Sequence, residues 1–91
     1  MTIKEAMRTY RLPYRTTPEE LECGWSRILN FGNRVLLAGH YFTGKGKPGY
    51  YGAVYEFLTE DTTCEGAIGL RTVSEVEFYD DGHAMAWAMN Q

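Results

Sequence analysis

One stretch of the sequence decides the fold class, and it has the pattern of a β-hairpin. Residues 34–43 read RVLLAGHYFT, residues 44–49 read GKGKPG, and residues 50–59 read YYGAVYEFLT. The outer segments are rich in aliphatic and aromatic residues, and the glycines, lysines and proline between them are typical of a turn. In the second segment large side chains alternate with smaller or charged ones, which is the period of a half-buried strand. The sequence therefore predicts an antiparallel hairpin over residues 34–59.

Two helices are predicted before this hairpin. The first, over residues 3–10, begins at a capping box that starts at Thr2, and it carries one apolar stripe. The second begins where Thr17 can cap and Pro18 suits the first helical position, and Gly32 provides its stop. Its apolar face consists of Leu21, Trp25, Ile28 and Leu29.

Two further strands are predicted after the hairpin. In the first of them Val76 and Phe78 alternate with polar residues before a turn at Asp81-Gly82. Residues 84–89 (AMAWAM) have a composition that favours a helix, but their strict alternation of small and large side chains leads us to predict a strand. The predicted fold is α+β, with two N-terminal helices packed on one face of a four-stranded antiparallel meander, in a single domain of residues 1–91.

The composition is that of an ordinary globular protein. Of 91 residues, 44% are hydrophobic and 23% are charged, which excludes an intrinsically disordered chain. No apolar run approaches the roughly 20 residues that a membrane-spanning helix needs, and the polar residues after Met1 are unlike a secretion signal. We therefore expect a cytoplasmic protein, in which Cys23 and Cys64 stay reduced and serve as packing residues.

The charge is unevenly distributed along the chain. The net charge is −3, so the protein lacks the overall basic excess of a typical nucleic-acid binder. Residues 1–49 hold eight of the nine lysines and arginines but four of the twelve acidic residues, whereas residues 50–91 hold one arginine and eight acidic residues. This asymmetry indicates a charged partner, or complementary contacts between copies of the chain.

Residues 39–46 (GHYFTGKG) match most of a phosphate-binding loop, but two features contradict that function. Gly46 stands where a serine or threonine would hold magnesium. A strand is predicted after the lysines, whereas phosphate binding of this kind needs the N-terminus of a helix. We interpret the segment as a hairpin turn that can make weak anion contacts.

Neither a metal site nor a catalytic site is predicted. The side chains that could bind zinc come from four separate segments, unlike the closely spaced pairs of known zinc sites; they are Cys23, His40, Cys64 and His83. No nucleophile motif is present, and neighbouring carboxylates in the C-terminal third are expected to face water. We predict that the protein is not an enzyme and carries no cofactor.

The strongest functional hypothesis is an acidic protein-binding surface. If Val76 and Phe78 point into the core, the same strand sends its acidic residues outward, and the following turn adds two more. The predicted partner-binding residues are Glu75, Glu77, Tyr79, Asp80 and Asp81. Secondary interface candidates, which a homodimer could also use, are Tyr50, Tyr51 and Tyr55. The alternative is that these acidic residues bind no partner and form a solvated face that keeps a small protein soluble.

In size, acidity and lack of catalytic motifs, the chain is similar in type to small phage- and plasmid-encoded inhibitors of host defence, such as anti-CRISPR and anti-restriction proteins. That resemblance implies a larger protein or nucleoprotein partner whose basic, nucleic-acid-binding site is blocked. One alternative is a nucleic-acid-binding protein that uses Arg8, Arg11 and Arg15, which are interleaved with tyrosines. Another is a small metal- or ligand-binding enzyme around His40 and His83.

Overall fold

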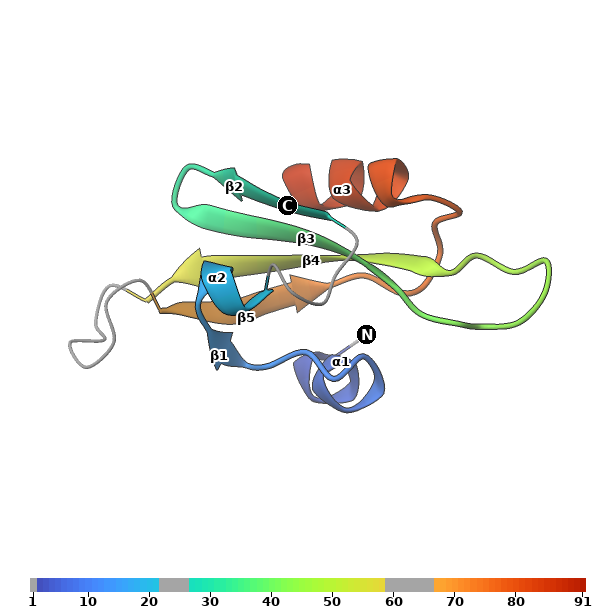
Figure 1. Cartoon of the computed structure of the whole chain (residues 1–91), viewed down its shortest axis with the longest axis horizontal. Helices are drawn as coiled ribbons and strands as arrows, with labels where there is room; N and C mark the ends of the chain where they lie inside the picture. Colours follow the sequence, from blue (N-terminus) through green and yellow to red (C-terminus); the bar gives the residue numbers. More distant parts are fainter. Residues whose placement is uncertain (1, 22–26, 59–66) are drawn as a thin grey trace.

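One antiparallel sheet organises the computed structural model, which describes residues 2–21, 27–58 and 67–91 (Figure 1). Within these ranges the strands are β1 (Arg15–Thr16), β2 (Arg27–Phe31), β3 (Arg34–His40), β4 (Tyr50–Phe57) and β5 (Ile68–Val73). The helices are α1 (Ile3–Thr9), α2 (Pro18–Leu21) and α3 (Asp81–Met89). The strand order is β1-β5-β4-β3-β2, so β2 to β5 form a meander and β1 adds a short antiparallel strand beside β5. The α+β class and the antiparallel sheet are thus confirmed.

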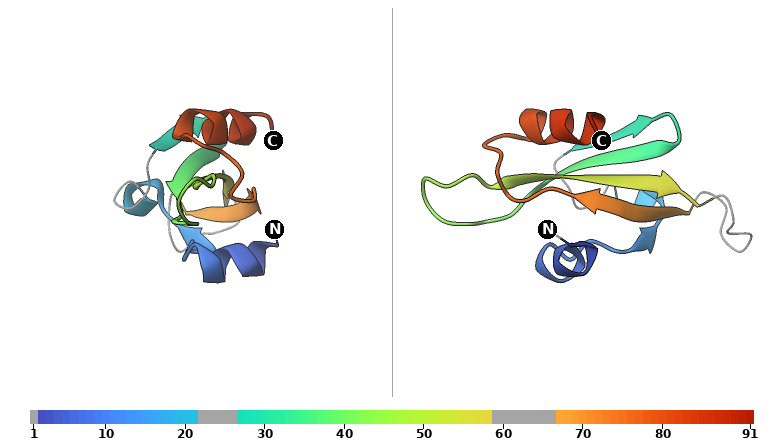
Figure 2. Two further views of the ribbon diagram at one scale, coloured as in Figure 1. Left: turned by 90° about the vertical axis from the view of Figure 1, so that its right-hand side faces the viewer. Right: turned by 180° about the vertical axis from the view of Figure 1, so that it is seen from behind.

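Both faces of the sheet are covered, whereas the sequence predicted helices on one face. Figures 1 and 2 show α1 and α3 on opposite sides of the sheet. The core on the α1 side consists of Ala6, Tyr10, Leu12, Leu21, Val35, Leu37, Tyr51, Ala53, Tyr55, Ile68, Leu70 and Val73. The core on the α3 side consists of Leu36, Ala38, Val54, Ala84, Met85 and Ala88. Because of this double cover, burial does not alternate along residues 35–39, which are all buried.

The first predicted helix is confirmed, but the second is wrong beyond its first turn. The Thr2 side chain accepts a hydrogen bond from the Glu5 N–H, as the capping box requires. The second helix is limited to Pro18–Leu21, and Arg27–Phe31 form a strand paired with β3. Gly32, with φ of 64°, begins a two-residue hairpin turn instead of ending a helix. The rest of that predicted helix, residues 22–26, lies outside the described residues.

The hairpin over residues 34–59 is confirmed as β3 and β4, but the two strands predicted after it are wrong. The meander is completed by β5, which the sequence pattern did not predict. Residues 74–80 form no strand: the Ser74 N–H donates to the Gly52 carbonyl at 2.8 Å, and Phe78 makes an isolated bridge to Tyr50. The predicted turn at Asp81-Gly82 is the first turn of α3, and residues 84–89 are helical.

Close packing against β4 explains why α3 is rich in alanine. Ala84 and Ala88 are fully buried and face the sheet, where larger side chains would hold the helix away. A Cβ atom built on Gly52 of β4 would lie 2.6 Å from the Ala84 carbonyl oxygen. Helix propensity and this close approach therefore outweigh the two-residue alternation. Neither α3 nor any other helix in the described ranges is long and apolar enough to cross a membrane.

Candidate binding surface at the β3–β4 loop

The loop between β3 and β4, residues 41–49, projects from one end of the molecule (Figure 1). The Tyr41 N–H donates to the Gly49 carbonyl at 2.7 Å, and the Thr43 hydroxyl donates to the Pro48 carbonyl at 2.6 Å. Gly44 and Gly46 take positive φ angles of 124° and 78°, which only glycine adopts readily. These bonds and glycines shape the loop without a covering helix.

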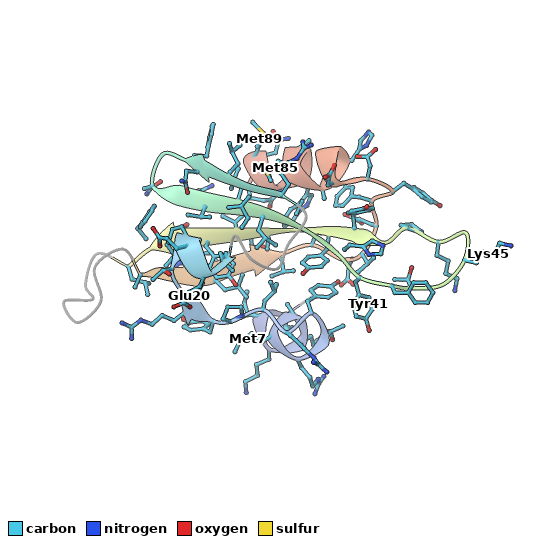
Figure 3. The ribbon with its side chains drawn as sticks, viewed as in Figure 1. Met7, Glu20, Tyr41, Lys45, Met85 and Met89 are labelled. Carbon is cyan, nitrogen blue, oxygen red and sulfur yellow. The ribbon has the colours of Figure 1, made fainter. Side chains whose placement is uncertain are left out.

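Aromatic and cationic side chains gather on this loop. Phe42 is 82% exposed and Tyr41 is 38% exposed, and both lie within six residues of the two lysines in the sequence. Lys45 and Lys47 are exposed as well, and Figure 3 shows Lys45 at the far tip of the loop. No acidic residue occurs between His40 and Tyr50. We call Tyr41, Phe42, Lys45 and Lys47 the loop surface.

A tyrosine cluster joins α1 to the base of the loop. The Tyr10 ring stacks on Tyr51 with centroids 3.8 Å apart, and it meets the Tyr41 ring edge-on at 5.4 Å. Burial, and secondly the charge of Glu75, raise the pKa of Tyr10 above its usual range, so its hydroxyl stays protonated. This packing holds the C-terminal end of α1, with exposed Arg8 and Arg11, against the loop base.

The third arginine of the predicted nucleic-acid set lies elsewhere. Arg15 on β1 pairs with Gly69, which lies opposite Glu56, whereas the loop enters β4 at the other end, Tyr50. Arg15 lines a shallow pocket of about 240 Å³ with Thr16, Thr17, Glu20 and Ala67. Arg8 and Arg11 thus flank Tyr10, which packs on Tyr41 at the loop base, whereas Arg15 lies toward the opposite end of the sheet.

The five predicted acidic-surface residues lie in one stretch, which we call the acidic segment (residues 75–81). It passes beside the loop base, where the Gly49 and Tyr50 N–H groups donate to the Phe78 carbonyl at 3.1 and 2.9 Å. Glu75, Glu77 and Tyr79 are exposed, although the segment is not the strand that the sequence predicted. The two aspartates make contacts within the chain: Asp80 caps α3, and Asp81 lies 3.8 Å from the Arg27 Nε atom.

Asp80 and His83 form an exposed carboxylate–imidazole pair at the start of α3. Asp80 Oδ1 accepts from the His83 backbone N–H at 2.7 Å, and His83 Nδ1 lies 2.8 Å from Oδ2. The backbone hydrogen bond, followed by the side-chain one, lowers the pKa of Asp80 below its ordinary value. The pair lines a pocket of about 210 Å³ with Glu77, Phe78 and Tyr79. This volume is below the ~300–1,000 Å³ of usual small-molecule sites.

We expect the Asp80→Ala variant to unfold at a lower temperature than the wild type, because α3 loses its N-terminal cap. A lowered carboxyl pKa adds stability that is complete above the unfolded-state pKa and is lost as the pH falls through the folded-state pKa. The difference between the two proteins should therefore be constant near neutral pH and shrink below about pH 4. Thermal melts from pH 2 to 7 measure it. The Asp80→Asn variant keeps a capping oxygen, and a melting temperature as low as that of the alanine variant would contradict the cap.

The secondary interface candidates are corrected by the structure. Tyr51 is 2% exposed and Tyr55 is fully buried, because β4 is covered on both faces, so neither offers a surface to a partner. The Tyr55 hydroxyl donates to the Pro13 carbonyl at 2.7 Å, which ties the segment after α1 to the sheet. Tyr50 is half-buried and packs against the His40 ring, with centroids 4.9 Å apart.

The residues considered for phosphate or metal binding are dispersed. The sequence that resembles a phosphate-binding loop runs from β3 into the hairpin loop, and β4 follows it, as the hairpin interpretation predicts. His40 lies at the end of β3 and His83 in α3, whereas Cys23 and Cys64 lie outside the described residues. Within the described ranges, no three histidine, cysteine or acidic side chains are grouped as metal ligands.

The fold and its surfaces define a small α+β protein with one antiparallel sheet, in which the hairpin loop carries exposed cations and aromatic rings. A family model described as nucleotide modification associated domain 4 (Nmad4) matches residues 12–91. The chain therefore belongs to the Nmad4 family. No curated protein and no solved structure matches the chain.

Proposed function

We propose that this chain is a non-enzymatic, cytoplasmic module that binds single-stranded nucleic acid for a nucleotide-modification system. The observation that carries the proposal is the loop surface, where Phe42 is 82% exposed between Tyr41 and two lysines. Proteins that hold single strands combine exposed aromatic rings, on which bases stack, with cations that contact the phosphates. The description of the family, which refers to nucleotide modification, supports the same class of ligand.

The flanking charges fit a small, local contact. Arg8 and Arg11 flank Tyr10, whose ring contacts Tyr41 at the loop base. Under the proposal, phosphates beside a base stacked on Phe42 meet cations from both the loop and this segment. The net charge of −3 argues against a long nucleic-acid track. A contact with a few nucleotides at one end of the molecule agrees both with the local cations and with the negative net charge.

The proposal predicts that a labelled single-stranded oligonucleotide binds the wild type and is released steeply as salt rises. The double variant Lys45→Glu/Lys47→Glu should weaken binding at least about tenfold and lower the salt slope by about two. Removal of the ring in Phe42→Ala should weaken binding about 5- to 100-fold, the usual value of one stacked base. Fluorescence anisotropy at several salt concentrations measures all three proteins.

Matched controls separate charge and stacking from general damage to the loop. Lys45→Arg/Lys47→Arg keeps both cations and Phe42→Trp keeps an aromatic face, so both should bind like the wild type. An affinity that stays the same in Lys45→Glu/Lys47→Glu and in Phe42→Ala would rule out the loop surface as the binding site.

A second candidate function is binding of the acidic segment to a basic site on a larger protein or nucleoprotein, as inhibitors of host defence do. The exposure of Glu75, Glu77 and Tyr79 in one short segment favours it. The contacts of Asp80 with His83 and of Asp81 with Arg27 reduce the charge available to a partner, which is why we rank it second. The Glu75→Lys/Glu77→Lys variant distinguishes the two functions: it should retain oligonucleotide binding under the first proposal, and lose a co-purifying partner under the second.

A further inference from the structure

We propose that the outer edge of β2 pairs with the same edge of a second copy, around a two-fold axis at Leu29. Among the described residues, no strand pairs with the outer edge of β2, the last strand in the order β1-β5-β4-β3-β2. The other end of the sheet is different, because β1 adds only two residues there. An open edge strand is a template for pairing with another chain.

The hairpin register shows which backbone groups of β2 face outward. Phe31 and Arg34 close a two-residue turn, and such a turn is closed by a hydrogen-bonded pair. Pairs then alternate, so Arg27, Leu29 and Phe31 bond to β3, whereas the N–H and C=O groups of Ile28 and Asn30 point away from the sheet. The same alternation holds on the other side of β3. There the odd-numbered residues bond toward β4, and the bond from the Tyr41 N–H to the Gly49 carbonyl continues that pattern.

A two-fold axis at Leu29 satisfies all of these outward groups. It places Ile28 of each copy opposite Asn30 of the other, so the two copies exchange four backbone hydrogen bonds. Leu29 then faces the second Leu29 as a non-hydrogen-bonded pair, the arrangement with the closer side chains. Because the pairing is symmetric, the partly exposed Leu29 side chain supplies both sides of the closest contact, which is why a second copy is the occupant we propose.

The side chains are apolar where the copies would meet. Leu29 is 38% exposed and Phe31 is 51% exposed, and both point to the α3 face, on which Met89 is 47% exposed (Figure 3). Ile28, on the other face, is half-buried against the α1-side core. Pairing would remove these apolar side chains from water, which favours association.

Charge also permits the pairing. Arg27 is the charged residue of β2, and its Nε atom lies 3.8 Å from Asp81 Oδ2 of the same copy. The two-fold register puts Arg27 opposite Phe31 of the second copy, where a guanidinium can lie over an aromatic ring. The two Arg27 residues would be four positions apart along the paired strands, about 13 Å, which is beyond the screening length in ordinary buffer.

The size of the contact predicts a weak dimer. A standard stable interface buries about 800 Å² on each partner, which is a large share of the 5726 Å² surface of this chain. One five-residue strand and a few flanking side chains are a smaller contact, so we expect association at micromolar to millimolar concentration. In such a dimer the long axes run antiparallel, and the two loop surfaces lie at opposite ends.

Sedimentation equilibrium on the whole chain, at concentrations up to about 1 mM, tests the pairing. The wild type should show a monomer–dimer equilibrium, and Leu29→Lys, which sets two ammonium groups opposite each other, should weaken it at least about tenfold. The melting temperature of Leu29→Lys at low concentration should match that of the wild type, because this side chain is partly exposed. A wild type that is monomeric throughout, or a Leu29→Lys variant that associates equally well, would overturn the proposal.

Cysteine cross-linking gives a second measurement of the register. In a Cys23→Ser/Cys64→Ser background, Leu29→Cys should form a disulfide-linked dimer on mild oxidation, because the Cα atoms of a non-hydrogen-bonded pair lie about 4.5 Å apart. Asn33→Cys, in the exposed turn of the same hairpin, serves as the control and should stay monomeric. Equal cross-linking at both positions would indicate random collision and would contradict the proposed axis.

Discussion

Alanine substitution of Leu36 and of Leu37, one at a time, is expected to reduce the free energy of unfolding by about 2–5 kcal/mol in each case. The two side chains are neighbours on β3 and point to opposite faces, and both are fully buried, one in the α3-side core and the other in the α1-side core. A domain of this size is stable by about 5–15 kcal/mol, so either change removes a large part of that stability. Urea titration followed by circular dichroism measures both losses.

The comparison between the two variants tests the architecture as well as the packing. In a sheet with helices on one face, one of two adjacent leucines would face water and its removal would cost little. Leu29→Ala on β2 is the matched control, since this leucine is 38% exposed and its loss should change stability by less than about 1 kcal/mol. If Leu36→Ala or Leu37→Ala lost as little stability as the control, that leucine would not be buried in a core as described.

A methyl group added at Gly52 is expected to displace α3. The new Cβ atom would lie 2.6 Å from the Ala84 carbonyl oxygen and 2.7 Å from the Trp87 ring. A backbone carbonyl cannot rotate away as the end of a flexible side chain can, so the helix itself must move. We expect Gly52→Ala to lose about 3 kcal/mol, the upper part of the usual range for overpacking.

The control for this prediction is Gly69→Ala on β5. There the added Cβ atom would meet Leu58 Cδ2 at 3.0 Å, and this methyl group can shift. Gly69→Ala should therefore stay within about 1 kcal/mol of the wild type. Chemical denaturation measures the free energies, and the NMR resonance of the Trp87 indole N–H reports whether α3 has moved. An unchanged Trp87 resonance and wild-type stability in Gly52→Ala would contradict the close contact.

The parts of the fold that depend on neighbouring residues could be predicted from the sequence. The first helix follows from its own capping box, and the central hairpin follows from a glycine- and lysine-rich loop between two apolar segments. The sequence predicts a helix at β2 because its two aliphatic residues fall at helical spacing from Leu21, and because Gly32 fits a helix end and a hairpin turn equally well. The alternation in residues 84–89 suggests a strand, and the contact that favours a helix is distant in sequence: the backbone of α3 at Ala84 lies directly against Gly52 of β4.

The candidate site could be predicted only in part. The sequence predicts weak anion contacts for the turn that carries the two lysines, but it places Phe42 in a strand. Phe42 follows the last backbone bond between the two segments, from the Tyr41 N–H to the Gly49 carbonyl, so its side chain lies beyond the part of the hairpin that the helices cover. An aromatic residue placed between the end of an apolar run and a glycine–lysine turn is a signal that could have identified it.

The stacking of Tyr10 on Tyr51 shows that the residues before the family match take part in the core. The match to the family model begins at Leu12, yet Ala6 and Tyr10 belong to the interior of the protein. The matched residues therefore do not include everything that covers the sheet. A chain cut at Leu12 would expose the Tyr51 ring and the apolar side chains around it to water, so this face of the sheet depends on residues outside the match.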